Sequence, residues 1–555
     1  MRGRHIFFDS LVAHGADAIF GNPGTTENPL LDSLDDYPGV AYYVALHEGV
    51  AVCAAGHYAM ASGKTAIANL HVAPGLGNAI GMMYGALKAN VPVIVTAGQQ
   101  DTRLRLRDPI LRHDLVAMAA PVTKWAAEAQ TADEIGPIMN RAFRIANTAP
   151  AGPVFVALPN NVMSAETGIA ATTAGQLFRN PPAQTAAVEQ LAGMLLSARS
   201  PAIFAGDDIA SAGANAAFTR LVESIGATVY TELLRSRQVI AARHPSLRGR
   251  IPVAAGELHP LLSEHDFLLM IGGPFVEEIW FDPVNPIPEH VTVAQIENSA
   301  ERLAYNYPLD LGVQGDIGAT LNALNSELED QATAEFRAAT ATRNEAHAVT
   351  KASALAKLDN LITRNESRTP MTPNVALHHL ANALPQDIIV VNEAVTAASD
   401  LEHAFAPVGE TDFYMGRGGG IGQGIAGALG ISIAHPDRKV VAVSGDGSAM
   451  YSIQALWTAA HHELDIIFVI LANREYRVLK HNMDTHRRRF DENPERPYPH
   501  MDLSNPALGF VDMARGMGIG AGSAATPGEV REQAGIVAKR RGPYLIELRV
   551  AGKDG

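Results

Sequence analysis

The stretch that decides the fold runs from Val440 to Tyr476 and reads VVAVSGDGSAMYSIQALWTAAHHELDIIFVILANREY. It predicts two apolar strands, Val440–Ser444 and Ile466–Leu471, joined by a glycine turn and a helix. A crossover of this length makes the two strands parallel, so their carboxyl ends lie at one edge of a sheet. Asp446 and Asn473 follow those two ends, and we therefore expect their side chains to lie close together.

These two side chains suit a metal ion that carries a diphosphate. A carboxylate and an amide oxygen are hard ligands of the kind that Mg²⁺ uses together with phosphate oxygens. A glycine turn that opens a helix adds a place where an anion is stabilised. Asp-Gly is also a common turn and Asn a common strand terminator, so Gly445-Asp446-Gly447 alone is more often only a turn. The turn, helix, strand and Asn473 in this order favour a magnesium–diphosphate site.

The order also resembles the thiamine diphosphate (ThDP) motif of the 2-oxoacid decarboxylase and acetolactate synthase superfamily, which starts with Gly-Asp-Gly and ends with Asn. The resemblance implies that Mg²⁺ is held by Asp446, Asn473 and the backbone carbonyl of Glu475. Within the superfamily the chain is most similar to the benzoylformate decarboxylases, over essentially its whole length. The stretches that carry this similarity are GNPGTTENP (21–29), NLHVAPGLGNA (69–79), PVIVTAGQQ (92–100) and GDGSAMYSIQALWTAA (445–460).

The rest of the chain repeats the alternation of strand and helix, which predicts an α/β protein with three doubly wound parallel-sheet domains. The first and third domains share length and alternation, as duplicated folds would. The expected parts are a pyrimidine-binding domain (1–180), a central α/β domain (183–345), a linker (346–368) and a diphosphate-binding domain (369–555). The expected strands are 18–20, 41–46, 65–70, 92–97 and 153–157, then 202–205, 228–230, 267–271 and 292–296, then 388–391, 440–444, 466–471 and 543–550.

The composition excludes several classes of protein. The chain has 555 residues, of which 47% are hydrophobic and 18% charged, and this balance is typical of a globular protein. Its formal net charge of −15 argues against nucleic acid or an anionic membrane as a partner. A single cysteine, Cys53, fits a reducing compartment. The sequence shows neither a signal peptide nor an apolar run of the ~18 residues that a membrane helix needs, so we expect a cytoplasmic protein.

Glu48 is the expected catalytic acid of the cofactor site. A glutamate that starts a helix is usually a surface residue that stabilises the helix dipole. In the resembled superfamily, however, a glutamate here hydrogen-bonds the pyrimidine N1′ of ThDP and activates the cofactor. The resemblance further makes Ile421 the aliphatic support of the bent cofactor and the Gly419 carbonyl the acceptor for its 4′-amino group. The other implied cofactor-binding positions are Asn392, Ala394, Val395, Thr396, Gly445, Gly447, Ser448 and Tyr476.

The predicted substrate pocket also comes from the resemblance. A serine that orders the substrate carboxylate corresponds to Thr25 or Thr26, with Thr25 the better alignment. His71 corresponds to a proton relay, although a lone histidine at a strand end is more often a structural hydrogen-bonding residue. Leu479 and Asn482 complete the predicted pocket.

Two departures from the benzoylformate decarboxylase pattern concern the substrate. A second active-site histidine is replaced by Ile279, so the acid that protonates the product is missing or is supplied elsewhere, for instance by His481 or His113. The segment after Asn473 carries polar residues where the relatives are mainly apolar and aromatic. Its arginine run 487–489 is expected to be solvated surface, and would favour an anionic substrate only if it lined the entrance.

Three functions are compatible with these residues. The first is a ThDP- and Mg²⁺-dependent decarboxylase that converts a 2-oxo acid to an aldehyde and CO₂. The alternative is a ThDP-dependent carboligase or lyase of the acetolactate synthase or 2-hydroxyacyl-CoA lyase type. A catalytically silent ThDP-fold protein is disfavoured, because Glu48, the metal motif and Ile421 occur together.

The partner of the chain is expected to be a second copy of itself. Glu48 and His71 belong to the first domain and the metal motif to the third. In the relatives the first domain of one chain faces the third domain of another, so a homodimer is the minimal active form and a homotetramer is usual. The glycine turns 205–207 and 271–274 are weak signals for a nucleotide site, and the sequence leaves open whether a nucleotide, FAD or CoA binds the central domain.

Overall fold

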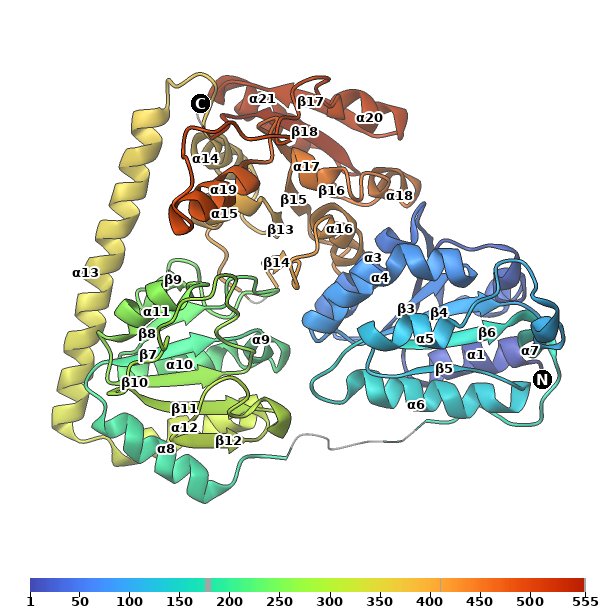
Figure 1. Ribbon diagram of the computed structural model, residues 1–555, viewed down its shortest axis with the longest axis horizontal. Coiled ribbons are helices and arrows are strands. Elements are labelled where there is room, and N and C mark those ends of the chain that lie inside the picture. Colours follow the sequence, from blue (N-terminus) through green and yellow to red (C-terminus); the bar gives the residue numbers. More distant parts are fainter. Residues whose placement is uncertain (174, 176–180, 410, 554–555) are drawn as a thin grey trace. The chain divides into compact units, whose positions relative to one another are not determined.

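The computed structural model describes residues 1–173, 175, 181–409 and 411–553. The chain forms two compact units, of which the first holds two parallel sheets and the second holds one (Figure 1). The first unit comprises 1–177, 365–405 and 415–555, and the second comprises 178–364 and 406–414. The predicted boundary at residue 180 lies outside the described residues, so the domain limits stay predictions.

The N-terminal sheet has the strand order β2-β1-β3-β4-β6-β5, and all its pairs are parallel. Its central strands are buried at every position, as expected for a sheet covered by helices on both faces. The strands are β1 (Ala18–Gly21), β2 (Ala41–Val44), β3 (Ala66–Leu70), β4 (Val93–Gln99), β5 (Ala126–Glu128) and β6 (Val154–Pro159). The longer helices are α1 (Gly3–Ala13), α3 (Glu48–Ser62), α4 (Val72–Lys88) and α6 (Ile135–Asn147).

The C-terminal sheet has the order β14-β13-β15-β16-β18-β17. Numbered within its own domain, this is the same order as in the N-terminal sheet, which confirms the expected duplication. Its strands are β13 (Ile389–Glu393), β14 (Phe413–Met415), β15 (Val440–Gly445), β16 (Ile466–Ala472), β17 (Gly520–Ala524) and β18 (Tyr544–Arg549). Its helices are α14 (Pro373–Ala383), α15 (Ala398–Phe405), α16 (Gln423–Ala434), α17 (Asp446–Ala449), α18 (Ala455–His461), α19 (Arg477–Arg489), α20 (Phe510–Gly516) and α21 (Pro527–Ala538).

The central sheet forms the core of the second unit, with the order β12-β11-β10-β7-β8-β9. Together the three parallel sheets confirm the predicted α/β fold class. The strands are β7 (Pro201–Ala205), β8 (Thr228–Thr231), β9 (Leu247–Arg250), β10 (Phe267–Ile271), β11 (Thr292–Glu297) and β12 (Leu311–Gln314). The longer helices are α8 (Thr185–Ser197), α10 (Asn215–Ile225), α11 (Ala255–Leu262), α12 (Ile317–Gln331) and the largely exposed α13 (Ala334–Asn365). Across the described ranges, no helix combines the length and apolar character needed to cross a bilayer.

The structure differs from the predicted elements at the sheet edges and in the opening crossover. All thirteen predicted strands are present, but β5, β9, β12, β14 and β17 were not predicted. Each of these five is an edge strand of three to five residues, and an edge strand needs no continuous apolar run because one side of it is unpaired. The crossover helix is two short helices, α17 and α18, because between them the amides of Tyr451, Ser452, Ala455, Leu456 and Trp457 bond to the carbonyl of the third residue before each.

Helices α3 and α16 pack closely within the first unit. Helix α3 is buried along almost its whole length, as expected for a helix that is apolar on all sides. A side chain at Gly430 of α16 would place its Cβ only 2.0 Å from the Ala54 carbonyl oxygen of α3. Only glycine permits this approach. The contact fixes the helix that begins at Glu48 against the helix that follows Ile421.

Candidate functional site

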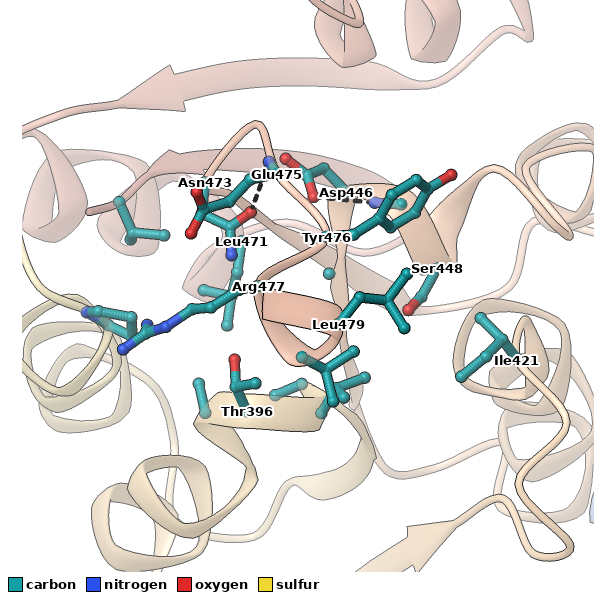
Figure 2. Close-up of a pocket in the computed structure, with 18 of the residues that line it drawn as sticks. Thr396, Ile421, Asp446, Ser448, Leu471, Asn473, Glu475, Tyr476, Arg477 and Leu479 are labelled. Carbon is teal, nitrogen blue, oxygen red and sulfur yellow. Dashed lines mark hydrogen bonds between the residues drawn. The ribbon is translucent and has the colours of Figure 1, made fainter. Parts of the chain in front are cut away.

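A cavity of about 390 Å³ lies at the carboxyl edge of the C-terminal sheet (Figure 2). The loops that follow β13, β15 and β16 supply most of its lining, as expected for a doubly wound sheet. Most predicted cofactor residues line it: Ala394, Val395, Thr396, Ile421, Gly445, Asp446, Gly447, Ser448, Asn473 and Tyr476, together with Glu475 and Leu479. The structure thus brings these residues together, and their roles remain predictions.

Three other predicted residues from the C-terminal part of the chain do not line this cavity. Asn482 and Gly419 are exposed. Asn392 is buried beneath the lining, where its Oδ1 accepts a hydrogen bond of 2.9 Å from the Ala394 amide. Its Nδ2 has no partner among the described residues. A buried amide donor without a partner is costly, and it leaves one hydrogen bond available beside the cavity.

The predicted metal ligands Asp446 and Asn473 end neighbouring parallel strands, with Gly445 of β15 paired to Leu471 of β16. Asp446 is buried, and its two carboxylate oxygens accept from the Gly447 amide at 2.8 Å and the Arg474 amide at 2.6 Å. Burial raises the pKa of Asp446 to about 6, although these two hydrogen bonds act in the opposite direction. The Oδ1 of Asn473 accepts from the Glu475 amide at 3.0 Å.

The donor set at this edge fits magnesium and does not fit zinc. The part of the chain that the structure describes contains no group of three or more His, Cys, Asp and Glu side chains that would hold a metal ion. Zinc sites need such groups. One carboxylate, one amide oxygen and one backbone carbonyl leave places for water and phosphate oxygens, which Mg²⁺ prefers.

Backbone strain marks the same loops. Val72, Val395 and Arg474 adopt positive φ angles of 43°, 49° and 58°. Each lies within two residues of the end of a strand, β3, β13 and β16 respectively. Positive φ is unfavourable for any side chain other than glycine, and most of all for a β-branched valine. Strain of this kind is concentrated at functional sites, and here it flanks the predicted residues His71, Thr396 and Asn473.

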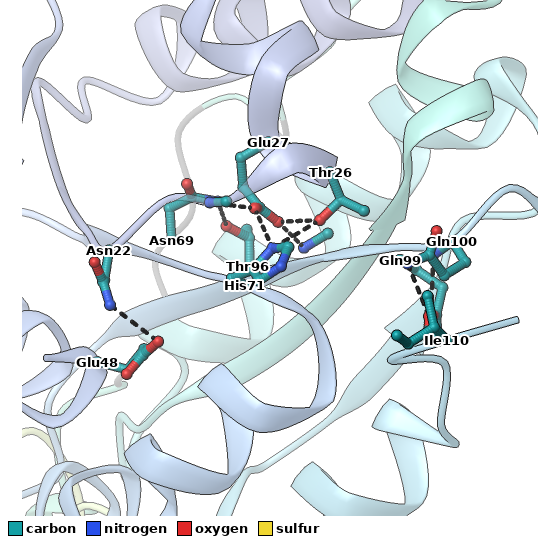
Figure 3. A network of polar contacts seen from close by, with 12 residues as sticks. Asn22, Thr26, Glu27, Glu48, Asn69, His71, Thr96, Gln99, Gln100 and Ile110 are labelled. Carbon is teal, nitrogen blue, oxygen red and sulfur yellow. Dashed lines mark hydrogen bonds and ion pairs between the residues drawn. The ribbon is translucent and has the colours of Figure 1, made fainter.

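Glu48 is buried in the first turn of α3. Its Oε1 accepts from Asn22 Nδ2 at 3.1 Å, as Figure 3 shows, and its Oε2 accepts from Asn78 Nδ2 at 3.0 Å. Since a carboxyl group offers about four lone-pair sites, each oxygen keeps capacity for one further partner. The two side-chain amides therefore fix the orientation of Glu48 and leave its carboxylate able to accept further hydrogen bonds.

His71 belongs to a network that the sequence did not reveal (Figure 3). Its Nδ1 lies 2.8 Å from Glu27 Oε2 and 3.2 Å from Thr26 Oγ1. Glu27 is only 3% exposed and also accepts from the amides of Gly24 and Gly98, both at 2.8 Å. Because Glu27 is an acceptor, it assigns the proton of neutral His71 to Nδ1 and leaves Nε2 free to accept or donate a proton.

The structure separates the two threonines that the sequence left as alternatives. Thr25 is exposed, whereas Thr26 is buried and donates to Glu27 Oε1 at 2.7 Å. The pattern Gly24-Thr25-Thr26-Glu27 carries the one signal that identifies Glu27, a glutamate that bonds back to the start of a short helix. That signal predicts a cap and gives no hint of the bond to His71.

The residues considered as a replacement acid do not reach the cavity. His113, His481 and Ile279 are exposed, and none of them is among its lining residues. Partial desolvation of its ring lowers the pKa of His481, and the nearby Arg477 lowers it further.

A buried acid missed by the sequence supports the Ile421 turn. Glu393 Oε1 accepts from the amides of Gly422 at 2.7 Å and Gln423 at 2.8 Å, and its Oε2 accepts from Ser444 Oγ at 3.1 Å. Burial raises the pKa of Glu393 to about 7, while these bonds lower it. Glu393 thus joins β13 and β15 to the start of α16.

The expectation of a solvated arginine run is wrong for Arg487. Its side chain is buried and donates to the carbonyls of Pro494 at 3.2 Å and Pro497 at 2.9 Å. Its guanidinium also lies over the Tyr498 ring, 4.8 Å from the centroid. Arg487 is buried because it satisfies the carbonyls of the loop that follows α19.

Comparison with known proteins agrees with this geometry. Three thiamine pyrophosphate enzyme models match the chain: the N-terminal TPP binding domain at residues 1–118, the central domain at 188–324 and the C-terminal TPP binding domain at 394–548. The benzoylformate decarboxylase of Pseudomonas aeruginosa is 29% identical over 545 residues, covering 98% of this chain and 97% of the relative. The acetolactate synthase isozyme 2 large subunit of Escherichia coli is 27% identical and covers 85% of this chain and 83% of its own length.

Solved structures show the same fold. The ThDP-dependent 4-hydroxybenzoylformate decarboxylase of Rhodococcus jostii superimposes with a TM-score of 0.85 at 25% identity, covering all of both chains. The benzoylformate decarboxylase of Polynucleobacter necessarius gives a TM-score of 0.87 at 23% identity. The chain therefore belongs to the thiamine pyrophosphate enzymes, and within them to the group of ThDP-dependent decarboxylases and acetolactate synthases.

Proposed function

We propose that the protein is a ThDP- and Mg²⁺-dependent decarboxylase that converts a 2-oxo acid to an aldehyde and CO₂. The observation that carries this proposal is the fixed orientation of His71. Its Nδ1 is bound to the buried Glu27 at 2.8 Å, so its Nε2 is available for proton transfer. A decarboxylase must deliver a proton to the carbon that has lost CO₂, and an oriented imidazole is a group that can transfer one.

The side chains at these two sheet edges fit the cofactor. Asp446, Asn473 and the carbonyl of Glu475 would hold Mg²⁺ with the diphosphate. Ile421 would support the bent cofactor, and Glu48, oriented by two amides, would hydrogen-bond its pyrimidine ring. When bound, ThDP supplies the electron sink for the loss of CO₂.

The predicted homodimer follows from the distribution of these residues. Glu48 and His71 are not among the residues that line the cavity of Asp446 and Asn473 in this chain. A second copy would bring an N-terminal edge to each C-terminal cavity, and the family resemblance favours a homotetramer. The N-terminal domain also exposes Leu106 by 89% and Ile110 by 80%, and apolar groups of this kind are covered in an assembly. A fully active monomer would contradict this part of the proposal.

A carboligase or lyase is the second candidate, and the exposed Ile279 favours it. A second histidine is expected at this position from the benzoylformate decarboxylase pattern, and isoleucine cannot donate a proton. If the carbon that has lost CO₂ is protonated more slowly, a carbonyl compound would have time to react with that carbon in place of the proton. The acetolactate synthase of Escherichia coli, at 27% identity, is consistent with such a reaction.

The discriminating experiment measures CO₂ and aldehyde together. The protein is incubated with ThDP and Mg²⁺ and a panel of aliphatic, aromatic and anionic 2-oxo acids, and both products are quantified. One aldehyde per CO₂ is expected for at least one substrate. Ligated products with little free aldehyde would overturn the decarboxylase proposal in favour of the carboligase.

A further inference from the structure

Arg477 is a cavity residue to which the predicted site gives no role. It is the first residue of α19, directly after Tyr476, and it lines the cavity of Asp446 and Asn473. Its Nε atom is buried and has no hydrogen-bond partner among the described residues, where its guanidinium also forms no ion pair within 4.0 Å. The side chain as a whole is half-buried, but a buried N–H donor without an acceptor is costly, so this arrangement points to a partner outside the chain.

Neighbouring basic residues of α19 differ in this respect. Lys480 is paired with Glu475, Arg487 donates to the carbonyls of two prolines, and Arg488 donates to Thr485 Oγ1 at 3.0 Å. These three cations have acceptors within the protein. Of the four basic residues compared, Arg477, which lines the cavity, is the one without an acceptor among the described residues.

The position of Arg477 selects one end of the cavity. In Figure 2 its side chain extends on the opposite side of the cavity from Ile421, beyond Asn473 and Thr396. Ile421 marks the end that would hold the cofactor rings. Asp446 and Asn473 mark the metal and the diphosphate, so Arg477 lies at the phosphate end.

The surrounding charge leaves room for an anion there. The acid that interacts electrostatically with Arg477 is Asp400 of α15, and burial raises the pKa of Asp400 while Arg477 lowers it. The two side chains do not form an ion pair in the described structure. The Glu475 carboxylate is already used by Lys480 and the Lys553 amide. A diphosphate carries roughly two to three negative charges near neutral pH, and Mg²⁺ together with Asp446 offsets only about one of them.

We propose that Arg477 anchors the cofactor by donating a charge-assisted hydrogen bond to the terminal phosphate of ThDP. This inference rests on ThDP as the cofactor of the proposed function and adds a ligand for the phosphate farthest from the rings. Guanidinium groups bind phosphate oxygens in this way, and such bonds are stronger than neutral ones.

The test compares two cofactor forms on matched variants of the full chain. Dissociation constants for ThDP and for thiamine monophosphate are measured by calorimetry with Mg²⁺ present, for the wild type, Arg477→Gln, Arg477→Lys and Arg488→Gln. Arg477→Gln is expected to weaken ThDP binding by about tenfold or more, from the loss of one charge-assisted bond. Thiamine monophosphate, which lacks the terminal phosphate, is expected to lose less than about twofold. Arg488→Gln removes the same charge from an exposed site of the same helix and is expected to bind both as the wild type does.

Arg477→Lys keeps the charge and is expected to recover most of the ThDP affinity, which a merely structural role for the guanidinium would not allow. Unchanged ThDP affinity in Arg477→Gln, or an equal loss for both cofactor forms, would overturn the inference. If Arg477→Gln does not fold, the lysine variant decides: a loss of affinity confined to ThDP supports the inference, and an equal loss for ThDP and thiamine monophosphate would overturn it. A wild-type chain that does not bind ThDP at all would refute the proposed function itself.

Discussion

The N-terminal and C-terminal sheets have the same strand order, yet their carboxyl edges are built in opposite ways. At the N-terminal edge the polar groups satisfy one another: Glu27 binds two backbone amides, Thr26 and His71, and Glu48 binds two asparagines. At the C-terminal edge Asp446 and Arg477 line a cavity of about 390 Å³, and Arg477 Nε has no partner among the described residues. One duplicated fold thus provides one edge whose polar side chains bind one another and one edge that holds a cavity.

Removing the charge of Glu48 should give the largest effect on this comparison. Glu48→Gln keeps the size of the side chain and removes the acid that would act on the cofactor. We expect kcat to fall on the order of 10³-fold, while the dissociation constant of ThDP changes only a few-fold. Steady-state kinetics and calorimetry on the same preparation measure both. Glu335→Gln, an exposed glutamate that also begins a helix, is the matched control and should leave kcat unchanged. Unchanged turnover of every active substrate in Glu48→Gln would show that the proposed mechanism is wrong.

Glu27→Gln tests whether the N-terminal network serves catalysis or only folding. Glutamine can accept from one side only, so it cannot satisfy the Gly24 and Gly98 amides and fix His71 Nδ1 at the same time. We expect kcat to fall about 10- to 100-fold, the range typical of groups that orient a reacting histidine, with little change in KM or in ThDP affinity. Nitrogen NMR of labelled histidine reports the tautomer of His71 directly. A variant with normal kcat, or one that loses only stability, would remove Glu27 from the mechanism.

How much of the fold and of the candidate site could be predicted from the sequence depends on how far apart along the chain the contacting residues lie. The convergence of Asp446 and Asn473 follows from one parallel crossover, so a single stretch of sequence predicts it. The contact of Glu27 with His71 and Gly98 joins segments 44 and 71 residues apart, and no local pattern encodes it. The five edge strands were not predicted because each has too few buried positions for a regular spacing of apolar residues to show in its sequence. Arg477 belongs to the polar segment after Asn473, but only the structure shows that it lines the cavity of Asp446 and Asn473.

The smallest expected effect concerns Glu393, the buried acid that supports the C-terminal edge. Its pKa is raised to about 7 by burial, so the folded state binds the proton more tightly than the unfolded state. Its contribution to stability is therefore fully present below about pH 4.5 and is lost as the pH rises through about 7. Glu393→Gln mimics the protonated form, and its amide can donate to Ser444 while its oxygen accepts from Gly422 and Gln423. As the pH rises from 5 to 8, we expect the unfolding temperature of the wild type to fall relative to that of Glu393→Gln. The expected difference is equivalent to about 1 kcal/mol in the free energy of unfolding. Exposed Glu189→Gln should follow the wild type, and parallel pH profiles for the wild type and Glu393→Gln would show that Glu393 keeps its charge in the folded protein.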